Sequence, residues 1–188
     1  MDTSVYRRIF EISMMGEIAP ETAHLSAVSV EHYGKLTVSV FELPTTDRVL
    51  YDFTDHLGGA ALSKNVQKTP SIVIDHWFTP RRAASMRLQS KASLAFKDVP
   101  LNGILRGYGF ISYFEARFND GDPAVLSIFV NNKKIGEEVI GNFDPLRPFH
   151  YPLNESGTGT VRFEVTAPNN GKRQFGLQAD VRLPGGDR

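Results

Sequence analysis

The stretch VRFEVTAPNNGKRQFGLQADVRL, residues 161–183, decides the fold class of this chain. Apolar residues occupy alternate positions on both sides of a central polar turn, and this period of two places them on one face of an extended strand. The apolar positions are Val161, Phe163, Val165 and Ala167, then Phe175, Leu177, Ala179, Val181 and Leu183. Residues 168–171 between the two runs are Pro, Asn, Asn and Gly, which favour turns. The stretch predicts two strands, each with one dry and one wet face.

The same period recurs upstream. An apolar set over residues 85–97 predicts one long strand, and its members are Met86, Leu88, Ala92, Leu94 and Phe96. Residues 110–118 predict another strand, with Phe110, Phe114 and Phe118 on its inner face. Two apolar runs at 126–130 and 135–140 flank a polar turn at residues 131–134, a pattern typical of a hairpin.

The N-terminal third is less regular. Weaker patterns predict strands at residues 36–43, 48–53 and 71–78. Residues 1–16 fit either a helix face or a strand, and we favour a strand. Because no long helical pattern separates the strands, the connections are expected to be hairpins or Greek-key crossings. The sequence therefore predicts an all-β chain with little helix: an antiparallel β-sandwich, of jelly-roll or similar type, that forms one domain over residues 1–188.

The composition excludes several classes of partner and of chemistry. The 188 residues contain 21 basic and 21 acidic side chains, so no overall field attracts nucleic acid, and none is expected as a partner. The chain has no cysteine, which excludes disulfides, thiolate catalysis and cysteine-ligated metals. No apolar run is long enough to span a bilayer, and the N-terminal residues do not have the pattern of a secretory signal peptide.

Asp75, His76 and Trp77 form the first candidate ligand site, with Arg81 close by in sequence. The face of an indole ring stacks on the apolar face of a sugar, and a neighbouring carboxylate or imidazole bonds the polar edge of the sugar. In the alternative interpretation Trp77 fills the core of the sandwich and His76 lies beside it on the surface. Further candidates are Tyr108, Tyr113 and Tyr151 for the outer face or a rim. Arg147 and His150 are candidates for a loop that borders a cleft.

Asp120 and Asp122, in a tight acidic loop, form the one candidate metal site. Oxygen ligands at alternate positions suit a hard cation such as calcium. Pro123 ends the segment where a calcium loop of the EF-hand type would continue, and Asp and Gly also form turns for conformational reasons alone. Calcium is thus the only cofactor that the sequence suggests, and a simple turn is the competing interpretation.

Catalytic signatures are missing from the sequence. The five histidines, at positions 24, 32, 56, 76 and 150, do not have the spacing of a helical metal pair, and no Gly-x-Ser-x-Gly motif is present. An acid and a base brought together only by the fold would leave no such signature. We favour a protein that is not an enzyme and keep an enzyme as the third hypothesis, after the two functions given below.

Several features of residues 104–183 follow a recognisable order. Residues 113–118 precede the apolar triplet and polar hairpin of LSIFVNNKK at 126–134, and runs at 160–167 and 174–183 follow. This order resembles the galactose-binding-like sandwiches, which include carbohydrate-binding modules often attached to glycoside hydrolases. The resemblance implies a galactose-binding-like fold and a carbohydrate ligand held by loops or by a sheet face.

Two functions remain open at this point. The first is a non-catalytic binding module, with carbohydrate as the expected ligand. The alternative is a structural or self-assembling subunit, or a protein–protein interaction subunit, built on a jelly-roll-like sandwich of the shell, tail or adaptor type. Zero net charge permits the close association that a homo-oligomer needs.

Overall fold

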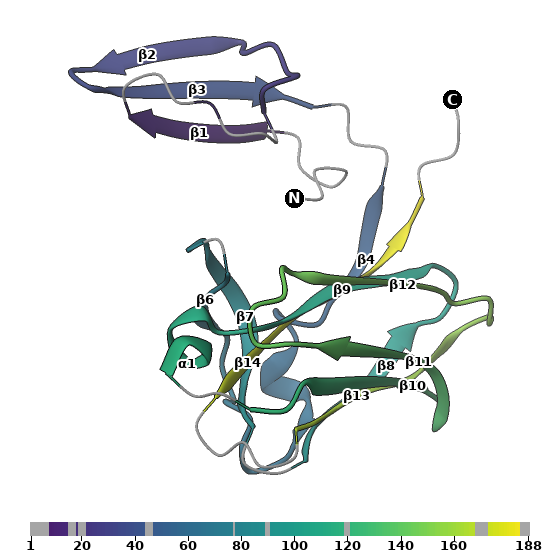
Figure 1. The fold of residues 1–188 in the computed structure, drawn as a ribbon. Coiled ribbons are helices and arrows are strands. Elements are labelled where there is room, and N and C mark those ends of the chain that lie inside the picture. The colour runs from purple at the N-terminus through teal and green to yellow at the C-terminus, as the bar shows by residue number, and fades with distance from the viewer. Residues whose placement is uncertain are drawn as a thin grey trace. The chain divides into compact units, whose positions relative to one another are not determined.

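The computed structural model describes residues 8–14, 18, 22–43, 47–76, 78–88, 91–118, 121–167 and 173–184. The chain forms two compact units (Figure 1). The sandwich unit is Val49–Leu183, and the N-terminal unit is Met1–Arg48 together with Pro184–Arg188. One domain over residues 1–188 stays a prediction, because compactness of the units does not report whether they unfold together.

Two sheets, antiparallel in every registered pairing, make up the sandwich unit (Figure 1). The five-stranded sheet has the order β11-β10-β13-β8-β5, that is Lys133–Ile140, Ala124–Val130, Thr158–Thr166, Ala92–Pro100 and Ala61–Leu62. The six-stranded sheet has the order β12-β9-β14-β7-β6, that is Arg147–Pro152, Ile104–Ile111, Gln174–Leu183, Pro80–Arg87 and Ser71–Ile74. Its sixth strand, β4 (Arg48–Asp52), pairs with β14.

The core lies between these sheets and is filled by the alternating apolar residues. Leu94 and Phe163 of the five-stranded sheet and Phe175 and Val181 of the six-stranded sheet are fully buried in one cluster. Burying apolar surface contributes about 25 cal/mol per Å², so this interior is the main stabilising term of the unit. The predicted antiparallel β-sandwich is confirmed.

The single long strand expected over residues 85–97 is wrong. The chain forms two strands there, β7 in the six-stranded sheet and β8 in the five-stranded sheet. All five of its predicted inner side chains are nevertheless buried, namely Met86, Leu88, Ala92, Leu94 and Phe96. The alternation of apolar residues continues where the chain passes from one sheet to the other, because the inner faces of both sheets pack on the same core.

The strand expected over residues 110–118 is wrong in its second half. β9 ends at Ile111, and Tyr113–Phe118 forms the short helix α1. Phe114, expected on an inner face, is 48% exposed. The chain also contains a 3₁₀ turn, η1 (Leu57–Gly59). Among the described residues no helix is long and apolar enough to cross a membrane.

The expected hairpin at residues 126–140 is confirmed. β10 and β11 pair directly, and Asn131 and Asn132 connect them with φ angles of 48° and 64°. Two consecutive residues in the left-handed region define a type I′ turn, whose twist matches that of the flanking strands. Asparagine tolerates this conformation better than other residues with a side chain, which explains the Asn-Asn pair.

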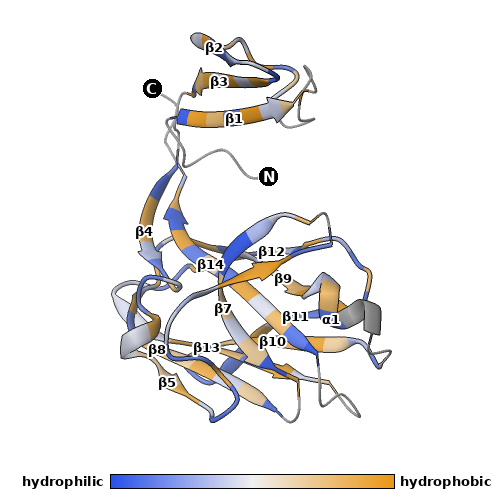
Figure 2. Cartoon of the chain, turned by 90° about the vertical axis from the view of Figure 1, so that its left-hand side faces the viewer, coloured by the Kyte–Doolittle hydropathy of each residue, from blue (hydrophilic) through white to orange (hydrophobic). Residues whose placement is uncertain are grey.

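The N-terminal unit contains a three-stranded antiparallel sheet of order β1-β3-β2. These strands are Arg8–Met14, Leu36–Glu42 and Ser29–Tyr33. On one face of this sheet, Phe10, Ile12 and Met14 are 63%, 70% and 58% exposed. Figure 2 shows apolar residues along β1 and β3. A single layer cannot cover both of its faces, so this sheet presents an apolar surface.

Candidate functional site

The hairpin between β6 and β7 is closed by Asp75, which is fully buried. Its Oδ1 accepts the backbone N–H of Thr79 at 2.9 Å, and its Oδ2 accepts Nε–H of Arg81 at 2.7 Å. The backbone adds N–H donation from Phe78 to the Asp75 carbonyl at 3.1 Å. Two of the predicted ligand residues, Asp75 and Arg81, thus form an internal ion pair that holds the turn.

Phe78 projects from this turn. Its φ of 59° lies in the left-handed region, which is uncommon for a bulky residue and costs about 1 kcal/mol. Strain of this kind persists where the surrounding structure fixes it, often at binding sites. The ring is 58% exposed and lies 4.4 Å from the Tyr113 ring and 6.0 Å from the Phe114 ring, between centroids.

His76, Phe78, Tyr113 and Phe114 together form a group that we call the aromatic cluster. The His76 ring lies 6.0 Å from the Tyr113 ring, and Tyr113 lies 5.8 Å from Phe114. The cluster joins the β6–β7 turn to α1, two segments far apart in sequence. Such tilted and edge-on ring pairs contribute about 0.5–1.5 kcal/mol each. The cluster is therefore an ordered apolar surface with exposed rings.

Helix α1 is held to the sheet beneath the cluster. Ser112, just before the helix, donates its N–H to the Gln174 carbonyl of β14 at 2.8 Å. Burial raises the pKa of the Glu115 carboxyl, although the charge of Arg87 and the backbone N–H of Gln174 act in the opposite direction. Glu115 thus turns toward β14 and β7, while Phe114 faces solvent.

Sequence reasoning found only part of this site. It singled out His76 and expected Tyr113 at an outer face or rim, but it missed Phe78 and Phe114. Phe78 was expected to end a strand at 71–78, and Phe114 was expected on the inner face of a strand at 110–118. The one available signal was the run of adjacent aromatic residues at 76–78 and 113–114. Trp77, the residue on which the sequence argument centred, lies outside the described residues.

Tyr108 and His150 lie elsewhere, on the face of the six-stranded sheet that is turned away from the core. Tyr108 of β9 lies opposite Gln178 and Pro148, and His150 of β12 lies opposite Arg106. Asp180 follows on β14, where Arg182 donates to it through Nε and Nη2 at 2.6 Å each. Burial raises the pKa of Asp180, an effect that Arg182 opposes.

Arg147 belongs to neither surface. Its Nε donates to Oε2 of Glu138 on β11 at 3.1 Å. Since β11 and β12 are edge strands of the two different sheets, this ion pair links the layers of the sandwich. The structure does not bring Arg147 together with Tyr108 or with the aromatic cluster as parts of one site.

The acidic loop at residues 121–122 is held by an arginine side chain of the protein. Asp122 is exposed, and its backbone carbonyl accepts a hydrogen bond from the guanidinium of Arg173, which is fully buried. The same guanidinium reaches the Gly121 carbonyl at 3.5 Å and the Asn142 side chain. Asp120 lies outside the described residues, and within the described ones no group of His, Asp or Glu is placed to hold a metal. Calcium therefore stays a prediction.

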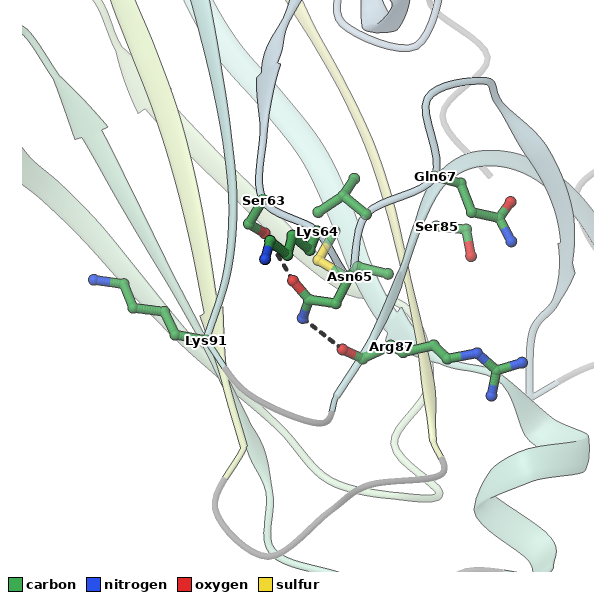
Figure 3. Close-up of a pocket in the computed structure, with 9 residues that line it drawn as sticks. Ser63, Lys64, Asn65, Gln67, Ser85, Arg87 and Lys91 are labelled. Carbon is green, nitrogen blue, oxygen red and sulfur yellow. Dashed lines mark hydrogen bonds between the residues drawn. The ribbon is translucent and has the colours of Figure 1, made fainter.

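A separate polar cavity of about 570 Å³ opens near the end of β7 (Figure 3). It lies between the loop after β5 and the start of β8. Most lining residues are polar or basic, and two, Val66 and Met86, are buried apolar residues. The full lining is Ser63, Lys64, Asn65, Val66, Gln67, Ser85, Met86, Arg87 and Lys91. None of these residues was a candidate in the sequence analysis. A cavity of this size is in the range of small-molecule sites.

Comparisons with known proteins agree with the fold. No family model and no curated protein matches the sequence. Three solved structures from the Clostridium perfringens protein ZmpB are similar. CBM51-2 with GlcNAc and INT domains has a TM-score of 0.52 at 10% identity and covers 94% of this chain and 48% of that one. CBM51-2 with INT domains has a TM-score of 0.51 at 11% identity and covers 82% and 36%.

The third similar structure is the M60 catalytic domain with CBM51-1 and CBM51-2, with a TM-score of 0.51 at 10% identity. The match covers 93% of this chain and 23% of that chain. This chain thus spans between about a quarter and about half of the lengths of these neighbours. At such low identity the likeness shows the fold alone, a carbohydrate-binding-module type of β-sandwich.

Proposed function

We propose that the sandwich unit is a non-catalytic carbohydrate-binding module and that the aromatic cluster is its binding surface. The observation that carries this proposal is the exposure of the Phe78 and Phe114 rings beside Tyr113 on a hydrogen-bonded turn and a short helix. Exposed aromatic side chains in a continuous group are unusual on a surface without a binding role. The fold that this unit shares with carbohydrate-binding modules supports the same assignment.

The chemistry of a sugar ring fits this surface. A pyranose has an apolar face of C–H groups, which packs on an aromatic ring, and a polar edge of hydroxyls. The Tyr113 hydroxyl and the His76 imidazole supply polar groups beside the rings. Because the Asp75–Arg81 pair fixes the turn before any ligand arrives, less conformational entropy is lost on binding.

N-acetylglucosamine is the first ligand to test, because a structural neighbour was solved with GlcNAc. Glycan-array screening of the whole chain, followed by calorimetry with the best oligosaccharide, measures the binding. Phe78→Ala and Tyr113→Ala should each weaken it by about tenfold, which corresponds to the loss of one ring contact. Phe143→Ala is the matched control, since Phe143 is 53% exposed but lies outside the cluster.

Two results would contradict the proposal. One is the absence of binding to any glycan on the array and in calorimetry. The other is glycan binding that survives Phe78→Ala and Tyr113→Ala unchanged while the variants keep the thermal stability of the parent chain. The second result would move the site away from the aromatic cluster even if the ligand class were right.

A second candidate function, self-association, is favoured by the N-terminal sheet. Phe10, Ile12 and Met14 of β1 register with Val40, Val38 and Leu36 of β3, which gives one continuous apolar face. We propose that a second copy of this chain covers that face, and net charge zero does not oppose such contact. Light scattering should then show a dimer or larger species that Ile12→Ser weakens, whereas the control Ile72→Ser, at a 62% exposed position on β6, does not. A strictly monomeric parent chain at high concentration would remove this candidate.

A further inference from the structure

The polar cavity has walls that are fixed before a ligand enters. Oγ of Ser63 donates to Oδ1 of Asn65 at 2.7 Å, and Nδ2 of Asn65 donates to the Arg87 carbonyl at 2.8 Å (Figure 3). The backbone N–H of Arg87 donates back to the Asn65 carbonyl at 2.9 Å, and Gln67 donates to the Ser85 carbonyl at 2.9 Å. The loop at residues 63–67 is thereby attached to β7 by both side-chain and backbone hydrogen bonds.

The charge of the lining is one-sided. Three lining residues are cationic, Lys64, Arg87 and Lys91, and no lining residue is acidic. The chain as a whole has no net charge, so this excess is local. Lys91 forms an ion pair with Glu164 at 2.7 Å, and Arg87 lies close enough to Glu115 for its charge to oppose the burial that raises the pKa of that carboxyl. Lys64 makes no ion pair with any residue in the described part of the chain. The cavity therefore keeps a positive potential that suits an anionic ligand.

The cations are spread along the cavity. Figure 3 shows the Arg87 and Lys91 side chains extending to opposite sides, with Lys64 near Asn65 between them. Cations that converge on one point hold a single small anion, whereas separated cations fit a longer ligand with several anionic groups. The amide of Gln67 is exposed and adds donor and acceptor capacity of the kind that bonds sugar hydroxyls.

We propose that this cavity binds an acidic oligosaccharide, one that carries carboxylate or sulfate groups on neighbouring sugars. Lys64 and Arg87 bind the anionic groups, and Gln67 bonds hydroxyls. The saccharide part of this assignment rests on the proposed function, while the anionic part rests on the lining charges alone. The site is distinct from the aromatic cluster, with which it shares no residue.

The test compares two ligands with the same sugar backbone, one with charged carboxylates and one with these groups neutralised as methyl esters. Trigalacturonic acid and its fully methyl-esterified form are titrated into the ¹⁵N-labelled whole chain, and amide shifts around residues 63–67 and 85–91 are followed by NMR. The acid should bind at least about tenfold more tightly than the ester, and its affinity should fall between about 50 mM and about 500 mM salt, because added ions screen the lining charges. Lys64→Ala and Arg87→Gln should each cost about tenfold, the loss expected for one charge-assisted hydrogen bond. The control Lys133→Ala, an exposed lysine in the β10–β11 hairpin, should leave affinity unchanged.

Several outcomes overturn the inference. They are equal affinity for acid and ester, binding that Lys64→Ala and Arg87→Gln leave unchanged, and no shift of the cavity amides with either ligand. Sodium sulfate is the third probe, and shifts as large at equal concentration as those of the acid would indicate an adventitious ion only. The proposed function is tested separately with a neutral glycan. If the aromatic cluster is its site, that binding is lost with Phe78→Ala and kept with Lys64→Ala; neutral-glycan binding that Phe78→Ala leaves unchanged would count against the proposed function and not against this inference. Thermal unfolding of each variant confirms that the fold is intact.

Discussion

The hydroxyl of Tyr151 donates a hydrogen bond of 2.9 Å to Oε1 of Glu138 and so joins β12 to β11. These strands are edges of the two different sheets, and the other carboxylate oxygen of Glu138 accepts the Nε–H of Arg147. One carboxylate thus connects two side chains of β12 across the open side of the sandwich. Burial, followed by the hydrogen bond to Glu138 and its charge, raises the pKa of Tyr151 to about 12.

Tyr151 should be the last of the six tyrosines to ionise. An alkaline titration followed by tyrosinate absorbance should show a step near pH 12 that Tyr151→Phe removes. Because the folded-state pKa lies above the unfolded value of about 10, the folded chain holds the proton longer and loses stability as pH rises from about 10 to about 12. Glu138→Gln should move the step to lower pH, since it removes the charge that disfavours the phenolate. A step unmoved in both variants would contradict the assignment.

Gly136 of β11 leaves the room in which the Tyr151 ring lies. A Cβ at this position would stand 2.0 Å from Cζ of Tyr151, closer than any real contact. Gly136→Ala should therefore push the ring away from Glu138 and lower the free energy of unfolding by about 1–3 kcal/mol, as overpacking does. The matched control is Gly58→Ala, where a Cβ meets nothing within 4 Å. Equal denaturant midpoints for both variants would show that the ring moves without cost.

Alternation of apolar residues was enough to predict the sandwich, because buried strand faces must be apolar whatever the topology. It did not reveal which sheet each strand joins. Met86 and Phe96 keep the same alternation although they lie on strands of different layers. A period of two reports which face is buried, and a crossing between layers leaves that period intact.

The candidate site was harder to predict for a related reason. Phe78 owes its exposure to a left-handed backbone angle, and Phe114 owes its exposure to a helix that begins after β9 ends. The Asp75–Arg81 pair holds the first within its own hairpin, but the contact of Phe78 with Tyr113 and the bond from Ser112 to Gln174 join segments far apart in sequence. No pattern within either segment encodes the partner on the other one.

The buried carboxylate of Asp75 should be the strongest single determinant of the β6–β7 turn. Asp75→Ala leaves the Thr79 N–H and the Arg81 guanidinium without this partner, and should lower the free energy of unfolding by about 3 kcal/mol. Asp75→Asn keeps an oxygen for Thr79 and should cost less. Urea unfolding of the three chains measures both differences. Identical losses for the two variants would assign the whole effect to the ion pair with Arg81.

Replacement of Phe78 by glycine and by alanine separates backbone strain from ring contacts. Both changes remove the ring from the aromatic cluster, but only glycine adopts a φ of 59° without steric cost. At an ordinary extended position glycine is less stable than alanine by about 0.5–1 kcal/mol, whereas here Phe78→Gly should be the more stable variant by about 1 kcal/mol. Urea unfolding measures the order of stability, and calorimetry should show that both variants lose glycan affinity equally. If alanine proves the more stable variant, the turn relaxes without the ring, and the left-handed angle is imposed by the packing of Phe78 on Tyr113.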